Sequence, residues 1–95
     1  MPEIKRAYLL KNSEKAYKFR EYFNKKEIKP FAVFKIKKRD ADKGYIYSYR
    51  GCTISFKPSS IKNKVYPKKL EIRIYSDQGI SAIKEINSEI EGIYF

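Results

Sequence analysis

The stretch "YIYSYRGCTISFK", residues 45–57, decides the fold because two runs of alternating side chains flank a central glycine. After Gly51, the run places Cys52, Ile54 and Phe56 on one face, which is typical of a half-buried β-strand. Gly51 itself either turns the chain or kinks it. Before it, tyrosines recur at every second position, which predicts another strand with an aromatic face: Tyr45, Tyr47 and Tyr49.

Further strands are predicted on both sides of this stretch, at residues 3–11, 31–39 and 69–76. Residues 40–44, "DADKG", have turn chemistry, so the strand before them should pair antiparallel with the tyrosine strand. Residues 58–69 contain two prolines, two serines and several lysines. This composition predicts a long basic loop.

Two helices are predicted, over residues 13–26 and 78–91, with Ser13 and Asp77 as their N-caps. Their apolar stripes are formed by Ala16, Phe19, Tyr22 and Phe23 in the first and by Ile80, Ile83, Ile86 and Ile90 in the second. The element order is therefore β-α-β-β-β-β-α within one domain, residues 1–95. It predicts an α+β fold, an antiparallel sheet of four to five strands with both helices on one face and the other face open.

Strand alternation assigns side chains to the two faces of this sheet. We expect the helices to cover the aliphatic face, made up of Ala32, Phe34, Ile36, Ile54, Phe56, Leu70, Ile72 and Ile74. The open face would then carry Arg6, Tyr8, Lys35, Lys37, Thr53, Ser55, Lys57, Lys69, Arg73 and Tyr75. We expect Tyr45, Tyr47 and Tyr49 to point outward with them, and Ile46 to join the core. Two alternatives stay open. Tyrosine has a high strand propensity, so a solvated sheet face can carry these residues without a ligand. The tyrosines could also pack inward, with Ile46 and Ser48 pointing out.

The charge of the chain indicates a class of partner. There are 22 Lys and Arg residues against 11 Asp and Glu, a formal net charge of +11. Residues 1–73 hold 21 of the bases and seven of the acids, whereas residues 74–95 hold one base and four acids. Bases concentrated in one part of a chain are typical of nucleic-acid binding, although an ordinary lysine-rich solvated surface would also produce them.

We therefore predict a non-enzymatic domain that binds DNA or RNA through an open sheet face and the basic loop. Aromatic side chains would stack on bases or sugars while cations hold the phosphates. The candidate binding residues are Arg6, Tyr8, Lys35, Lys37, Tyr45, Tyr47, Tyr49, Arg50, Lys57, Lys62, Lys64, Lys69, Arg73 and Tyr75. The alternative is a protein-interaction module, such as a host-factor inhibitor or adaptor that covers an acidic or nucleic-acid-binding surface, or a homodimer formed through the tyrosine-rich face.

Several functions are disfavoured by composition. The chain has no histidine, so histidine-dependent nucleophile pairs and the commonest metal ligand are missing. A nuclease built on an acid and an E-x-K triplet has only short matches, such as "EIK" at residues 3–5. Cys52 is the single cysteine and is expected in the core. We predict no catalytic residue, metal or cofactor. No apolar run reaches the roughly 18 residues of a membrane span, which favours a soluble cytoplasmic protein.

Overall fold

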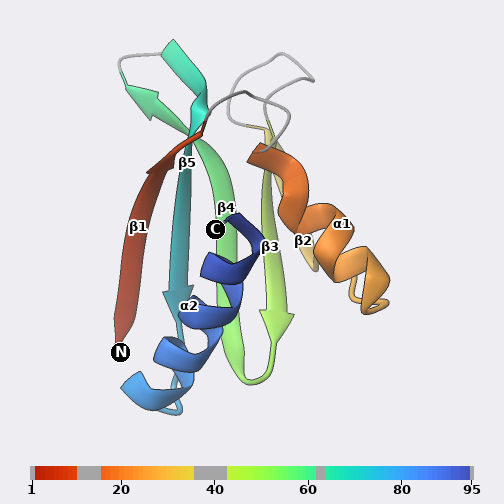
Figure 1. The fold of residues 1–95 in the computed structure, drawn as a ribbon, viewed down its shortest axis with the longest axis vertical. Coiled ribbons are helices and arrows are strands. Elements are labelled where there is room, and N and C mark those ends of the chain that lie inside the picture. Colours follow the sequence, from red (N-terminus) through yellow and green to blue (C-terminus); the bar gives the residue numbers. More distant parts are fainter. Residues whose placement is uncertain (1, 11–15, 36–42, 62–63, 95) are drawn as a thin grey trace.

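The computed structural model describes residues 2–10, 16–35, 43–61 and 64–94, and it shows a five-stranded antiparallel sheet with two helices (Figure 1). The elements are β1 (Glu3–Leu9), α1 (Lys18–Lys25), β2 (Ala32–Lys35), β3 (Lys43–Tyr49), β4 (Cys52–Ile61), β5 (Lys64–Tyr75) and α2 (Ile80–Tyr94). The order across the sheet is β1-β5-β4-β3-β2. The predicted α+β class and element order are confirmed.

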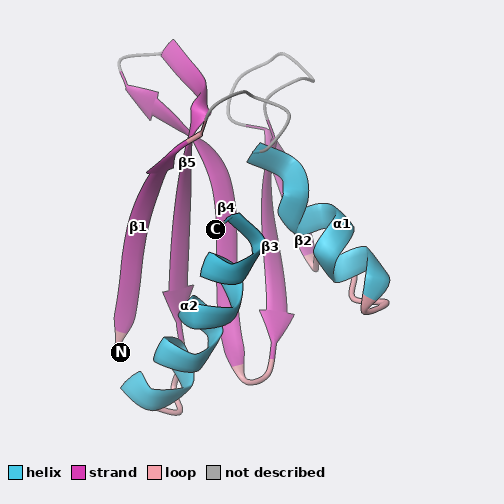
Figure 2. Ribbon diagram, viewed as in Figure 1, coloured by secondary structure: helices cyan, strands magenta, loops and turns pink. Residues whose placement is uncertain are grey.

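Both helices lie on the same face of the sheet, as predicted, with α2 in front of β4 and α1 in front of β2 and β3 (Figure 1 and Figure 2). The predicted helical stripes are buried at Phe19 and Phe23 in α1 and at Ile83, Ile86 and Ile90 in α2. They pack on side chains of the three central strands: Tyr45, Tyr47, Cys52, Ile54, Phe56, Leu70, Ile72 and Ile74. In the described part of the chain, no helix covers the opposite sheet face.

The expected outward orientation of the tyrosines is wrong. Strand register pairs Tyr47 with Ile54 and Tyr45 with Phe56, so these side chains share the face that the helices cover. Tyr47 is 1% exposed and Tyr45 is 6% exposed. Tyr49 pairs with Cys52 on the same face and packs against the core. Because the two most central rings are buried, this face presents no exposed row of tyrosines to a second copy of the chain.

Residues of the two helices explain how tyrosines fit in this core. A buried tyrosine needs a partner for its hydroxyl. The Tyr49 hydroxyl donates a hydrogen bond to Glu89 of α2, at 2.8 Å. Burial raises the pKa of Tyr47, and the positive charge of Arg20 in α1 partly offsets this rise. The Arg20 guanidinium also lies 4.8 Å from the Tyr45 ring centroid.

The outer strands β1 and β2 are also turned over relative to the prediction. Arg6 pairs with Ile72, and Tyr8 with Leu70, which places both on the helix-covered face. Arg6 forms an ion pair with Glu91 at 2.8 Å, and the Tyr8 ring stacks on Tyr94, 6.0 Å away between centroids. These contacts with α2 hold β1 in the observed orientation.

In β2, Ala32 pairs with Ile46 and Phe34 pairs with Gly44, so both lie on the open face and not in the predicted core. Lys35 pairs with Lys43, which lies two positions before Tyr45 in β3 and therefore on the same face. Lys35 is thus on the helix-covered face of the sheet. Its predicted place on the open face is wrong. Ile36 and Lys37 lie outside the described residues.

The predicted basic loop at residues 58–69 is wrong, because β4 extends to Ile61, β5 begins at Lys64, and the two strands pair with each other. The strand register shifts between Pro58 and Ser59, and prolines are tolerated in sheets at such irregularities. Beyond the shift, the described residues of β4 and β5 pair with each other, Ser59 with Tyr66 and Ser60 with Val65. This end of the hairpin projects past the sheet at the top of Figure 1.

The turn between β3 and β4 needs glycine. Arg50 has φ +50° and Gly51 has φ +78°, the combination of positive angles that a two-residue type I′ hairpin turn requires. A Cβ atom on Gly51 would also lie 2.5 Å from the side-chain oxygen of Gln78. Of the two predicted roles of Gly51, a turn or a kink, the structure shows the turn.

We expect Gly51→Ala to destabilise the protein by about 1–2 kcal/mol, the cost of a left-handed backbone conformation for a residue with a Cβ. Gly92→Ala is the matched control, since it lies inside α2 and a Cβ there meets no atom within 4 Å. That change should stabilise by about 0.5–1 kcal/mol. Urea unfolding of both variants measures the two effects, and the same sign for both would contradict the assigned turn.

Candidate nucleic-acid interface

The open sheet face is built by cross-strand register. One row of paired residues runs across all five strands, from Lys5 through Arg73, Ser55 and Ile46 to Ala32. Ser55 and Ile46 in this row line a hollow together with residues of the neighbouring rows. Its volume is about 250 Å³. It is lined by Lys5, Phe34, Ile46, Ser55, Lys57, Glu71, Ile72, Arg73 and Tyr75.

Cations surround this hollow, and carboxylates fix some of them. Lys57 lies 3.5 Å from Glu71, whose carboxylate also accepts a hydrogen bond from Ser59 at 3.0 Å. The Arg73 guanidinium lies 2.6 Å from the Glu3 carboxylate. These pairs are partly exposed, so they orient side chains more than they stabilise the fold.

Two further cations of the open face are free to take an external anion. Lys5 lines the hollow from β1, and Lys69 lies further along β5, directly opposite Leu9. Within the described ranges, neither lysine has a carboxylate at ion-pair distance. The open face therefore presents four cations: Lys5, Lys57, Lys69 and Arg73.

Two aromatic side chains complete the face. Phe34 extends over Gly44 of the neighbouring strand, and a Cβ atom on that glycine would lie only 2.1 Å from the tip of its ring. Tyr75 ends β5 between Glu3 and Thr53. Both rings are half-buried and line the hollow. Covering a glycine is a structural role for Phe34, whereas Tyr75 has no such task.

The predicted site residues divide into two groups in the structure. Lys57, Lys69, Arg73 and Tyr75 lie together on the open face, as predicted, with Thr53 and Ser55 beside them. On or toward the helix-covered side lie Arg6, Tyr8, Lys35, Tyr45, Tyr47, Tyr49 and Arg50. Lys37 and Lys62 are outside the described residues, and for Lys64 only the strand position is described.

Sequence reasoning missed Lys5, Phe34 and Ile46, which line the hollow. Strand alternation puts Lys5 on the face opposite to Arg6 and Tyr8. Because the prediction placed those two residues on the open face, it did not count Lys5 among the residues of that face. A signal was available for Phe34 and Gly44. An aromatic residue opposite a glycine on an adjacent strand is a recognised arrangement, in which the ring covers the glycine.

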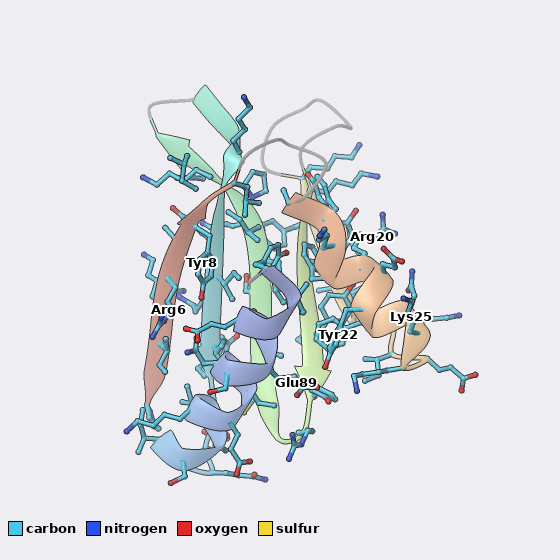
Figure 3. All side chains as sticks on the ribbon, viewed as in Figure 1. Arg6, Tyr8, Arg20, Tyr22, Lys25 and Glu89 are labelled. Carbon is cyan, nitrogen blue, oxygen red and sulfur yellow. The ribbon has the colours of Figure 1, made fainter. Side chains whose placement is uncertain are left out.

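A second cluster of titratable groups lies where α1, α2 and the β3–β4 turn meet (Figure 3). The Glu89 carboxylate accepts hydrogen bonds from Tyr22 and Tyr49, and lies 3.6 Å from Lys26 and 3.7 Å from Arg50. Arg50, predicted as a nucleic-acid contact, also lies 3.6 Å from Glu85. Glu89 thus joins groups of both helices and of the β3–β4 turn, so the cluster ties the helices to the sheet.

No protein-family model matches the chain, and neither the curated proteins nor the solved structures include a significant match. The fold and the open face therefore define this protein only as a small basic α+β domain with one uncovered sheet face. Within the described residues, no helix is long and apolar enough to cross a bilayer. No group of three acidic or sulfur side chains gathers there as a metal site.

Proposed function

We propose that the protein is a non-enzymatic nucleic-acid-binding domain and that the open sheet face is its binding surface. The observation that carries this proposal is the convergence of Lys5, Lys57, Lys69 and Arg73 on a sheet face without a helix. Two half-buried aromatic rings lie on the same face. The chain as a whole has a net charge of +11, which attracts a polyanion from a distance.

The helix side is a weaker candidate for this role. Several of its basic side chains have partners: Arg20 lies over the Tyr45 ring, Lys25 is 3.6 Å from Glu21, and Lys26 is 3.6 Å from Glu89. The acidic residues Glu85, Glu89 and Glu91 of α2 lie there as well, and they repel phosphates. The open face has two carboxylates, each already held by a cation.

A second candidate is a protein-interaction module. It is favoured by the apolar side chains at the edges of the sheet, since Leu9 is 84%, Phe31 63% and Val33 52% exposed. Edge strands with exposed apolar residues can pair with a strand of another chain. These residues lie at the two opposite edges of the sheet, Leu9 in β1, Val33 in β2 and Phe31 just before β2.

The proposal is tested by the salt dependence of DNA binding. Each phosphate neutralised by a lysine contributes about 0.7–0.9 to the slope of log K against log[salt]. Lys5→Gln/Lys69→Gln should therefore lower the slope by about 1.4–1.8 units. Fluorescence anisotropy of a labelled oligonucleotide at several salt concentrations measures this slope.

Lys18→Gln/Lys84→Gln is the matched control, because it removes the same charge from exposed positions on α1 and α2. It should leave the slope close to that of the wild type. Equal slopes for the two double variants would contradict the open face as the binding surface. Binding that does not respond to salt would contradict the proposed function altogether.

A further inference from the structure

The hollow on the open face differs from an ordinary basic surface in its shape and lining. Ser55 and Ile46, which pair across β4 and β3, line the hollow, and Phe34 of β2 and Tyr75 of β5 line it as well. Its volume, about 250 Å³, is below the roughly 300–1,000 Å³ of sites for drug-sized ligands. It therefore suits one small flat group and not an extended molecule.

The two aromatic rings and the cations favour different parts of a nucleotide. Aromatic side chains stack on bases, and this stacking tolerates any base because each has a π-face. Lys5, Lys57 and Arg73 line the same hollow and can hold the phosphates on either side of the base. In a duplex, the bases are already stacked and paired, so only its phosphates reach such a surface.

We propose that the hollow between Phe34 and Tyr75 takes an unpaired base, so that the protein prefers single-stranded nucleic acid. This inference rests on the proposed nucleic-acid binding and names its substrate class. The base stacks on Tyr75, and Phe34 closes the other end of the hollow. The flanking phosphates lie on Lys5 and Arg73.

The test compares two single strands of equal length and equal phosphate count, an oligothymidylate and the same strand with all its sites abasic. The abasic strand should bind roughly 5- to 150-fold more weakly, the range expected for the loss of one stacked base. Equal, salt-dependent affinities would overturn the base site while leaving the proposed function standing. If neither strand binds, both proposals fail.

Variants at Tyr75 test whether the ratio of the two affinities, for the oligothymidylate and for the abasic strand, depends on a ring that lines the hollow. Tyr75→Ala should bring the affinities for the two strands close together without changing the salt slope, and Tyr75→Phe should keep the wild-type ratio. Tyr75 is preferred to Phe34 for this purpose, since Phe34 also covers Gly44. Circular dichroism melting confirms that both variants are folded. An unchanged ratio in the folded Tyr75→Ala protein would overturn the base site.

Discussion

Tyr47→Ala should destabilise the protein by about 3–5 kcal/mol, the cost of truncating a large buried aromatic residue. The Tyr47 side chain is 1% exposed, and its ring stacks on Phe23 at 4.3 Å between centroids. It also meets Phe19 and Phe56 edge-on, at 6.0 and 5.9 Å. Removing the ring leaves a cavity where α1 meets the sheet. Urea unfolding measures the loss.

Tyr47→Phe is the control for this prediction. It keeps the ring and removes only the hydroxyl, which is close enough to Arg20 for that charge to affect its pKa, so it should cost no more than about 1.5 kcal/mol. A near-neutral Tyr47→Ala variant would place the tyrosine on the solvated face of β3. That result would reverse the assignment of the two sheet faces.

Glu89→Gln should destabilise the protein by about 1.5–3 kcal/mol, the range for hydrogen bonds that involve a charged group. The Glu89 side chain is 23% exposed, and it accepts hydrogen bonds from the Tyr22 and Tyr49 hydroxyls. A neutral amide retains the shape but loses the attraction to Lys26 and Arg50. Glu85→Gln is the matched control, because Glu85 is 70% exposed and an exposed ion pair contributes at most about 1 kcal/mol.

The effect of Glu89→Gln should depend on pH. Burial acts to raise the pKa of the Glu89 carboxyl, but hydrogen bonds from Tyr22 and Tyr49 and the charges of Lys26 and Arg50 outweigh it and lower the pKa below 4.5. The carboxylate therefore stabilises the fold fully above pH 4.5 and loses this contribution as the pH falls through the lowered pKa. The difference between wild type and variant should shrink in acid. A difference that grows in acid would contradict the assigned role of the carboxylate.

The elements of this fold could be predicted from local patterns, whereas the orientation of several strands could not. Leu70, Ile72 and Ile74 alternate with charged residues, so β5 had only one apolar face to bury. In β3, one face carries tyrosines and the other carries Ile46 and Ser48, and alternation alone does not choose between them. The choice depends on hydroxyl partners such as Glu89, which lies 40 residues further along the chain from Tyr49.

The same limit explains which site residues were predicted. Lys57, Lys69 and Arg73 belong to β4 and β5, whose buried faces are unambiguous in sequence, and the structure places all three on the open face. Lys5 and Phe34 belong to outer strands that have mixed faces. The orientation of β1 depends on distant contacts such as that of Arg6 with Glu91 in α2, and no local pattern reports these contacts.

The binding surface is tested most directly by the isoleucine methyl signals of the protein during titration with a single-stranded oligonucleotide. Ile46 lines the hollow on the open face, whereas Ile80 is exposed at the start of α2 and Ile28 follows α1. Binding to the open face should shift the Ile46 methyl signal and leave those of Ile28 and Ile80 unchanged. Shifts at Ile28 or Ile80 with an unchanged Ile46 signal would place the ligand on the helix side and contradict the proposed interface.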